Sequence, residues 1–253
     1  MCGRFALTHK TKDVEMLMGV FDHEDFPARY NIAPTDPVLM VLAGHPREPG
    51  SNLPDKRSML VRWGLIPAWV KDPKGMSLLI NARSETAIEK PAFKAAMRHR
   101  RGLIPASGFY EWRRENGRTG QAYWVRPRHR GVVAFAGLME TYAEPGGAEI
   151  DTGAILTTSA NETIRHIHDR MPIVIQPEDF SRWLDCRTQE PRDVVDLMRP
   201  ADPDFFEFIP VSDKVNKVAN MGPDIQNEVV PSEREPEPKP AKPKQDPGQL
   251  SLF

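Results

Sequence analysis

The stretch GVVAFAGL at residues 131–138, followed by GAILTTS at residues 153–159, decides the fold class of this chain. Both are short, rich in β-branched or aromatic residues and bounded by turn-forming residues, which is typical of buried strands. Five similar runs are spread along the sequence: PVLMVLA at 37–43, SMLVRW at 58–63, SLLINA at 77–82, QAYWVR at 121–126 and FFEFIPV at 205–211. The chain is therefore predicted to be built mainly on strands.

Helical patterns are fewer. One follows Thr11, which is suited to cap it; a second runs from Pro91 to Gly102, and a third is PEDFSRWL at 177–184. Two of them begin with proline, which is favoured in a first helical turn. Because strands outnumber helices without strict alternation, we expect a single α+β domain with an antiparallel or mixed, barrel-like sheet and peripheral helices.

The composition changes sharply near the C-terminus. From residue 231 the stretch PSEREPEPKPAKPKQDPG contains six prolines and no aromatic residue, so it cannot bury enough apolar surface to fold. We expect a folded domain over residues 2–225, a disordered linker over 226–248 and a separate peptide over 249–253.

That terminal peptide, QLSLF, is apolar in an otherwise polar tail. A frayed end is the simpler interpretation. However, the pentapeptide resembles the bacterial sliding-clamp binding motif, in which Gln249, Leu250, Leu252 and Phe253 would fill a pocket on the replication clamp.

Charge and cysteine content limit the class of protein. Lys and Arg total 34 against 35 Asp and Glu, so a DNA site must come from local clustering. Two cysteines, Cys2 and Cys186, are too few for a disulfide framework and lack the spaced partners of a zinc site. No apolar run reaches the length of a signal-peptide core or a membrane span. We expect a cytoplasmic monomer without metal or cofactor.

Cys2 carries a distinctive chemistry once Met1 is removed, as a small second residue permits. Its α-amine has an ordinary pKa of about 7.7 to 8.0 and its thiol one of about 8.5. The amine can form a Schiff base with an aldehyde, and the thiol can close it into a thiazolidine in a fast intramolecular step. On position alone, an ordinary second residue is the simpler interpretation.

Six short strings change that weighting. They are MCGRF at 1–5, YNIAP at 30–34, RWGLIP at 62–67, INARSET at 80–86, GFYEW at 108–112 and IHDRMP at 167–172. In this order they resemble the SOS-response-associated peptidase (SRAP) family from the N-terminus to about residue 220. The resemblance implies a DNA-damage protein, associated with the nucleoid, that crosslinks covalently to abasic sites in single-stranded DNA.

The resemblance also implies roles for four residues. Cys2 is the nucleophile, and Asn81 orients the cysteine and the sugar by hydrogen bonds. Glu111 moves protons during Schiff-base formation and ring closure, and His168 sits by the opened deoxyribose. From the residues alone, Glu111 also fits a surface ion pair and His168 a structural histidine.

Further positions are implied to contact DNA. Arg4 and Arg83 would hold phosphates that flank the lesion, and Pro34 would line the site. The rings of Trp63, Trp69 and Trp112 would stack on bases or wedge between them; core packing is the alternative for each. Basic clusters at residues 94–101 and 126–130 face either DNA or solvent.

Two other functions stay open. An N-terminal cysteine whose own amine acts as base is the logic of N-terminal-nucleophile hydrolases, so a thiol peptidase or autopeptidase is the first alternative. A non-covalent module for single-stranded or modified DNA is the second. A Schiff base at the sugar would also acidify the neighbouring carbon, which predicts weak abasic-site lyase activity.

Overall fold

The computed structural model describes residues 2–21, 25–45, 50–115, 118–144 and 146–230. The predicted clamp-binding peptide, with Gln249, Leu250, Leu252 and Phe253, and most of the predicted linker lie outside this range. Residues 228 and 229, which the sequence assigned to the linker, pair with the last strand, β13 (Phe206–Val211): Glu228 forms a bridge with Val211, and the Val229 N–H donates to the Pro210 carbonyl.

A closed five-stranded barrel forms the centre of the molecule. Its strands are β3 (Pro37–Ala43), β4 (Lys56–Trp63), β6 (Arg101–Ala106), β9 (Val133–Ala143) and β10 (Glu149–Ser159). The ring β10-β4-β3-β6-β9 closes because β9 also pairs with β10. Only the β10–β4 pairing is parallel in this ring. The predicted α+β class with a mixed, barrel-like sheet is confirmed.

Three short strands extend the barrel. β5 (Asn81–Arg83) runs parallel to β10, and β11 (Arg170–Pro172) runs antiparallel to the end of β10. β12 (Val174–Ile175) pairs with β9. The strands β5 and β11 therefore meet the same stretch of β10.

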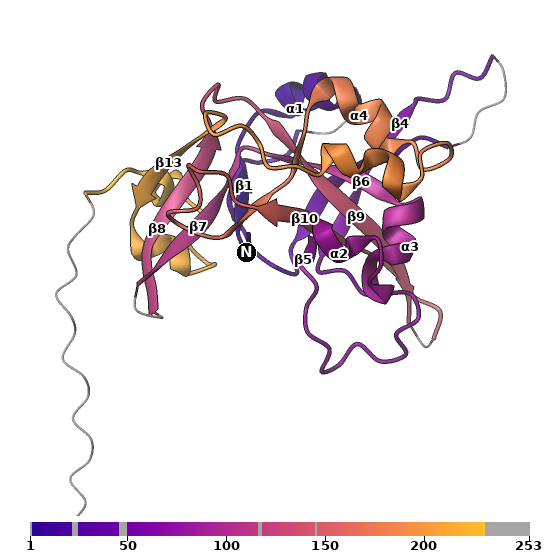
Figure 1. Cartoon of the computed structure of the whole chain (residues 1–253), viewed down its shortest axis with the longest axis horizontal. Coiled ribbons are helices and arrows are strands. Elements are labelled where there is room, and N and C mark those ends of the chain that lie inside the picture. The colour runs from indigo at the N-terminus through magenta and orange to yellow at the C-terminus, as the bar shows by residue number, and fades with distance from the viewer. Residues whose placement is uncertain (1, 22–24, 46–49, 116–117, 145, 231–253) are drawn as a thin grey trace, which may run out of the picture.

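A second, wholly antiparallel sheet stands beside the barrel (Figure 1). Its order is β13-β8-β7-β1-β2, with β8 spanning Arg118–Pro127, β7 Gly108–Glu115, β1 Phe5–Leu7 and β2 Arg29–Ile32.

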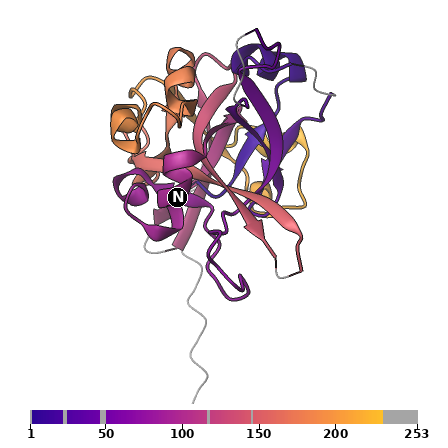
Figure 2. The same cartoon turned by 90° about the vertical axis from the view of Figure 1, so that its right-hand side faces the viewer.

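Short helices lie at the periphery of the strands (Figure 2). The α-helices are α1 (Thr11–Met18), α2 (Ser84–Ala87), α3 (Pro91–His99) and α4 (Phe180–Leu184), and the 3-10 segments are Pro177–Asp179, Pro191–Leu197, Asp213–Asn216 and Pro223–Gln226. In the part of the chain that the structure describes, no helix has both the length and the apolar character needed to cross a bilayer.

Two predicted helix boundaries are wrong. Lys10, not Thr11, holds the cap position of α1, and the Thr11 hydroxyl instead accepts the Phe26 N–H at 3.2 Å. α3 ends at His99, and Gly102 belongs to β6. Pairing with β9 on one side and β3 on the other outweighs the helical pattern that continues to Gly102.

Aromatic rings join the two sheets. Phe5 of β1 meets Trp63 of β4 edge-on, with ring centroids 5.1 Å apart, and Phe135 of β9 at 6.3 Å. Phe109 of β7 meets the same Phe135 at 6.1 Å. Such edge-to-face pairs add to the apolar area that they bury. They fix the start of the chain between the barrel and the second sheet.

Candidate active site

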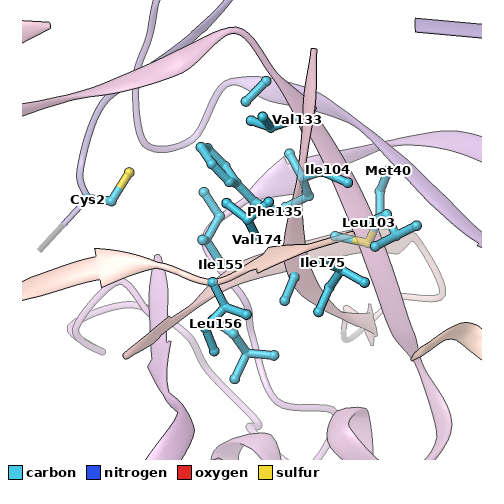
Figure 3. Close-up of a cluster of buried hydrophobic side chains, with 14 of the residues drawn as sticks. Cys2, Met40, Leu103, Ile104, Val133, Phe135, Ile155, Leu156, Val174 and Ile175 are labelled. Carbon is cyan, nitrogen blue, oxygen red and sulfur yellow. The ribbon is translucent and has the colours of Figure 1, made fainter. Parts of the chain in front are cut away.

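The site begins with Cys2, three residues before the ring of Phe5. Its side chain is fully buried, at the margin of the apolar cluster on the side of Phe135 (Figure 3). The thiol lies 3.8 Å from the carbonyl oxygen of Arg4. The ring contacts of Phe5 with Trp63 and Phe135 therefore determine where the cysteine lies.

Asn81 connects this start of the chain to the barrel. It is the first residue of β5, and its Nδ2 donates to the Cys2 carbonyl at 2.8 Å. Its Oδ1 is buried without a hydrogen-bond partner among the described residues. A buried, unpaired acceptor beside the cysteine is suited to take a hydrogen bond from a ligand.

Trp63 positions Asn81 from within the core. The ring is fully buried, and its Nε1 donates to the carbonyl of Ile80 at 2.9 Å. The same carbonyl accepts from the Ile155 N–H of β10 at 3.0 Å. With no exposed surface, the Trp63 ring cannot stack on a base here, so this part of the DNA-contact prediction is corrected in favour of core packing.

Glu111 lies on β7, opposite Tyr123 of β8, and is only 2 % exposed. Burial raises the pKa of its carboxyl, and the nearby Asp169 carboxylate adds to the effect. It is therefore not a solvated surface glutamate, the alternative that the sequence left open.

His168 precedes β11, and its side chain is 14 % exposed. The Arg170 N–H donates to His168 Nδ1 at 3.0 Å, and Asp169 Oδ1 lies 2.9 Å from the same nitrogen. A neutral ring accepts at Nδ1 from Arg170, whereas an imidazolium donates there to Asp169. The ring thus has a partner in both protonation states.

An ion pair connects the segments that carry Asn81 and His168. Arg170 binds Glu85 of α2 through two hydrogen bonds of 2.6 and 2.8 Å and also donates to the Thr157 carbonyl at 2.7 Å. Bidentate pairs of this kind fix geometry as well as adding energy. Sequence reasoning gave Glu85, Asp169 and Arg170 no role, although all three lie within the strings INARSET and IHDRMP.

The site keeps its titratable groups close enough to influence one another. Burial raises the pKa of the Cys2 thiol well beyond its ordinary range, and the charge of Glu111 raises it further. Thiol and carboxyl both favour their protonated forms. The arrangement can therefore donate protons to a reacting group.

The remaining residues predicted to contact DNA differ in how exposed they are. Asn81 and Arg83 project from the same side of β5, and Arg83 is exposed, as is Trp69, whose exposed fraction is 65 %. Pro34 is half-buried in the turn after β2. These three residues have surface available for a ligand.

Arg4 and Trp112 already have protein partners. Arg4 donates to Asn31 Oδ1 at 2.7 Å and to the Val215 carbonyl at 2.9 Å. Its guanidinium lies 6.0 Å from the centre of the Trp112 ring, and Trp112 Nε1 donates to Asn216 Oδ1 at 2.7 Å. Burial lowers the pKa of Arg4.

The members of the predicted basic cluster at residues 94–101 have different surroundings. Arg98 and Arg100 pair with Glu190 and Glu140, and Arg101 is buried. Within the described ranges, no three His, Cys, Asp or Glu side chains gather as a metal site requires.

Fold and site together define a class of protein: a mixed barrel flanked by an antiparallel sheet, with a second-position cysteine held between them beside a buried carboxyl. A family model described as SOS response associated peptidase (SRAP) matches residues 1–218, and the chain belongs to this family.

Relatives match over nearly the whole chain. Abasic site processing protein YoqW of Bacillus subtilis (strain 168) is 36% identical over 228 residues, which cover 89% of this chain and 98% of that protein. Abasic site processing protein YedK of Escherichia coli (strain K12) is 31% identical over 234 residues, covering 89% and 98%. A crystal structure of a protein from Bacteroides thetaiotaomicron shares the fold, with a TM-score of 0.75 at 22% identity, covering 90% of this chain and 100% of that one.

Proposed function

We propose that this protein captures abasic sites in single-stranded DNA through a thiazolidine on Cys2, exposed by removal of Met1, and so shields the lesion at replication forks. The observation that carries the proposal is the placement of Cys2, buried and bonded through its carbonyl to Asn81, beside the buried carboxyl of Glu111. The relatives named abasic site processing proteins supply the substrate class.

The chemistry balances without a cofactor. The Cys2 amine attacks C1′ of the ring-opened sugar to give a carbinolamine, and loss of water leaves an iminium. The thiol sulfur then attacks the iminium carbon, forming a C–S bond while the C=N double bond becomes single. The thiol proton leaves to a base, and one water is released overall.

Glu111 and His168 suit the proton transfers. A protonated Glu111 can protonate the departing hydroxyl of the carbinolamine, and the resulting carboxylate can take the thiol proton on ring closure. His168, supported at Nδ1 in both of its protonation states, can assist opening of the sugar hemiacetal. Because the thiol is un-ionised, we propose that the amine reacts first.

Two substitutions at Cys2 test this order. Cys2→Ala should abolish the heat-stable adduct with abasic single-stranded DNA while only modestly weakening reversible binding, because phosphate contacts remain. Cys2→Ser keeps the amine and should give at most an unstable Schiff base, trapped by borohydride. A heat-stable adduct with the alanine variant would rule out the proposal; a non-covalent DNA-binding module would leave DNA retention unchanged by either substitution.

Weak abasic-site lyase activity follows from the same intermediate. The iminium acidifies the carbon next to C1′, so slow β-elimination should nick the strand. A sequencing gel of the abasic strand measures this, and complete absence of incision across the pH range would count against it.

A thiol peptidase is the second candidate, favoured by the description of the family model as a peptidase. In that case, the Cys2 thiol would attack a peptide amide with its own amine as base. Incubation with a peptide amide and, separately, with abasic single-stranded DNA distinguishes the two: amide hydrolysis without any DNA adduct would favour the peptidase.

A further inference from the structure

A second concave surface lies outside the Cys2 site. It is a groove of about 920 Å³, and no residue assigned above to the site lines it. Its walls come from the end of β3, the start of β4, the end of α3 and the chain that follows α4. These elements gather on the far side of the barrel from the second sheet (Figure 1).

The groove is basic although the chain as a whole is not. Among the described residues it is lined by five Lys or Arg side chains and two carboxylates, Asp55 and Asp185, whereas the whole chain has a formal net charge of -1. Asp185 is also engaged by its own turn, accepting the N–H groups of Arg187 and Thr188 at 2.9 and 3.0 Å. The excess of positive charge is therefore concentrated locally.

Two of the five cations are available to a ligand. Arg100 pairs with Glu140, and Lys56 donates to the Met18 carbonyl. By contrast, within the described part of the chain no carboxylate pairs with Arg57 or Arg187. Arg57 does donate to the thioether sulfur of Met59 at 3.5 Å, but this weak acceptor leaves its charge uncompensated. Guanidinium groups without a carboxylate partner favour an anionic ligand, and their fork geometry matches phosphate.

One wall of the groove is held firmly in place. The buried Arg101 donates to four carbonyls, three of them in the segment that starts at the end of α4 and forms this wall: Met97, Trp183, Asp185 and Gln189. Arg98 donates to the carbonyl of Cys186 in the same segment. A preformed wall spares the entropy cost of ordering it when a ligand binds.

Among the described residues no Phe, Tyr or Trp lines the groove, and its aromatic rings are the smaller imidazoles of His45 and His99. Proteins that hold the bases of a single strand stack them on large aromatic rings, so this lining, in which Lys and Arg predominate, is suited to phosphates more than to bases. We propose that this groove binds the sugar-phosphate backbone of DNA at a distance from the lesion, through Arg57 and Arg187. This inference rests on the proposed function, which supplies DNA as the ligand.

The test is a pair of charge reversals, Arg57→Glu and Arg187→Glu, combined in the full-length protein. The matched control, with the same change in net charge, combines Arg192→Glu and Arg199→Glu, because both arginines are exposed and neither lines the groove. Equilibrium binding is measured over a range of salt with a long single strand and with a short oligonucleotide spanning only the abasic nucleotide and its neighbours. Adduct yield is measured with the short oligonucleotide, and thermal unfolding checks that each variant folds.

We expect the groove variant to bind the long strand about tenfold more weakly at low salt, with a salt dependence less steep by roughly 0.7 per lost phosphate contact. The control should match the wild type. Adduct yield with the short oligonucleotide should be unchanged, because neither arginine contacts a residue of the Cys2 site.

Other outcomes separate the two proposals. Equal affinity of wild type and groove variant for the long strand overturns the groove assignment even if adducts form normally. Weakened binding of a nucleoside triphosphate with unchanged binding of the long strand also overturns it, because the groove would then hold a free nucleotide. Loss of adduct in the wild type would sink the proposed function, while the binding measurements would still report on the groove.

Discussion

At the scale of single residues, Cys2 and Glu111 share a burial that changes what each can do. The pKa of both is raised, mainly because burial disfavours the charged form. A carboxyl that stays protonated beyond its ordinary range is suited to act as an acid near neutral pH. The same desolvation carries a cost in stability whenever the carboxyl ionises.

Glu111→Gln separates activity from stability. Removing the carboxyl should slow adduct formation about 10²-fold or more, because general acid–base catalysis is lost. The native state holds the Glu111 proton more tightly than the unfolded state. The contribution of this carboxyl to native stability is therefore fully present below pH 4.5 and is lost as pH rises through the raised pKa. The glutamine variant should therefore be the more stable protein at neutral pH, with the difference vanishing below pH 4.5.

Urea unfolding at several pH values, together with single-turnover adduct kinetics, measures both effects. A variant that is less stable than the wild type at neutral pH would mean that the carboxyl is ionised and well paired in the fold, contrary to the role given to it.

Asp169→Asn tests the coupling between the two proton-transfer groups. The Asp169 charge contributes to the raised pKa of Glu111, so its removal should shift the descending limb of the adduct rate, where Glu111 loses its proton, to lower pH. The shift should be modest because the Asp169 side chain is 84% exposed and screened by solvent. Asp204→Asn, which removes an exposed carboxylate elsewhere, is the control and should leave the pH profile in place.

The sequence predicted four central site residues only through the resemblance, because Cys2, Asn81, Glu111 and His168 are far apart along the chain. Nothing in the local pattern distinguished a surface Glu111 from a buried one. For Trp63, the sequence could not distinguish base stacking from core packing for the same reason. Its ring is buried by contact with Phe5 of the other sheet, and the periodicity of either strand does not encode that contact.

At the scale of elements, the strands that were predicted are those with uninterrupted apolar runs, such as β3 and β10. SLLINA at 77–82 is different, because only its last two residues enter β5 and Leu79 forms just an isolated bridge with Leu65. Strands β6 and β7 were missed, since proline and glycine punctuate RGLIPASGFYEW. The parallel β10–β4 and β10–β5 pairings have no signal within either strand.

Gly108, the glycine within RGLIPASGFYEW, is required by the local backbone. Its φ of +152° is rare for other residues, and a Cβ there would lie 2.3 Å from the Val125 carbonyl oxygen. Gly108→Ala should therefore push β7 away from β8 and cost about 1–3 kcal/mol through overpacking and strain. Because Glu111 lies three residues further along β7, adduct formation should also slow.

Gly146→Ala is the matched control for the clash. Gly146 also has a positive φ, +126°, but no atom lies within 4 Å of its added Cβ. Denaturant unfolding should show the larger loss for Gly108→Ala; equal losses would mean that backbone strain, not the approach of β8, accounts for the requirement.

At the scale of the whole molecule, the start of the chain lies between a closed barrel and an antiparallel sheet, and the two layers supply different parts of the site. The short strands that extend the barrel carry Asn81, on β5, and hold His168, just before β11, whereas the second sheet contributes Glu111. A cysteine on a loop tip would have none of these neighbours. The fold thus brings Cys2, the Glu111 carboxyl and the segment that carries the His168 imidazole into one region.

Deletion of residues 249–253 tests the separation of functions along the chain. If QLSLF binds the sliding clamp, the deletion should abolish association with a purified clamp while leaving adduct yield on free single-stranded DNA unchanged. Replacing Leu252 and Phe253 by alanine should have the same effect. Retained clamp association in both variants, measured by equilibrium binding, would mean that QLSLF does not bind the clamp.

Peptide mapping by mass spectrometry identifies the residue that carries the sugar. The protein purified from its host is reacted with an abasic oligonucleotide, digested and fragmented. We expect an N-terminal peptide that starts at Cys2 and carries the sugar remnant on that residue, so that its mass is the sum of peptide and remnant less one water. A mature chain that retains Met1, or a sugar attached to a lysine or to Cys186 instead, would rule out capture by the Cys2 aminothiol.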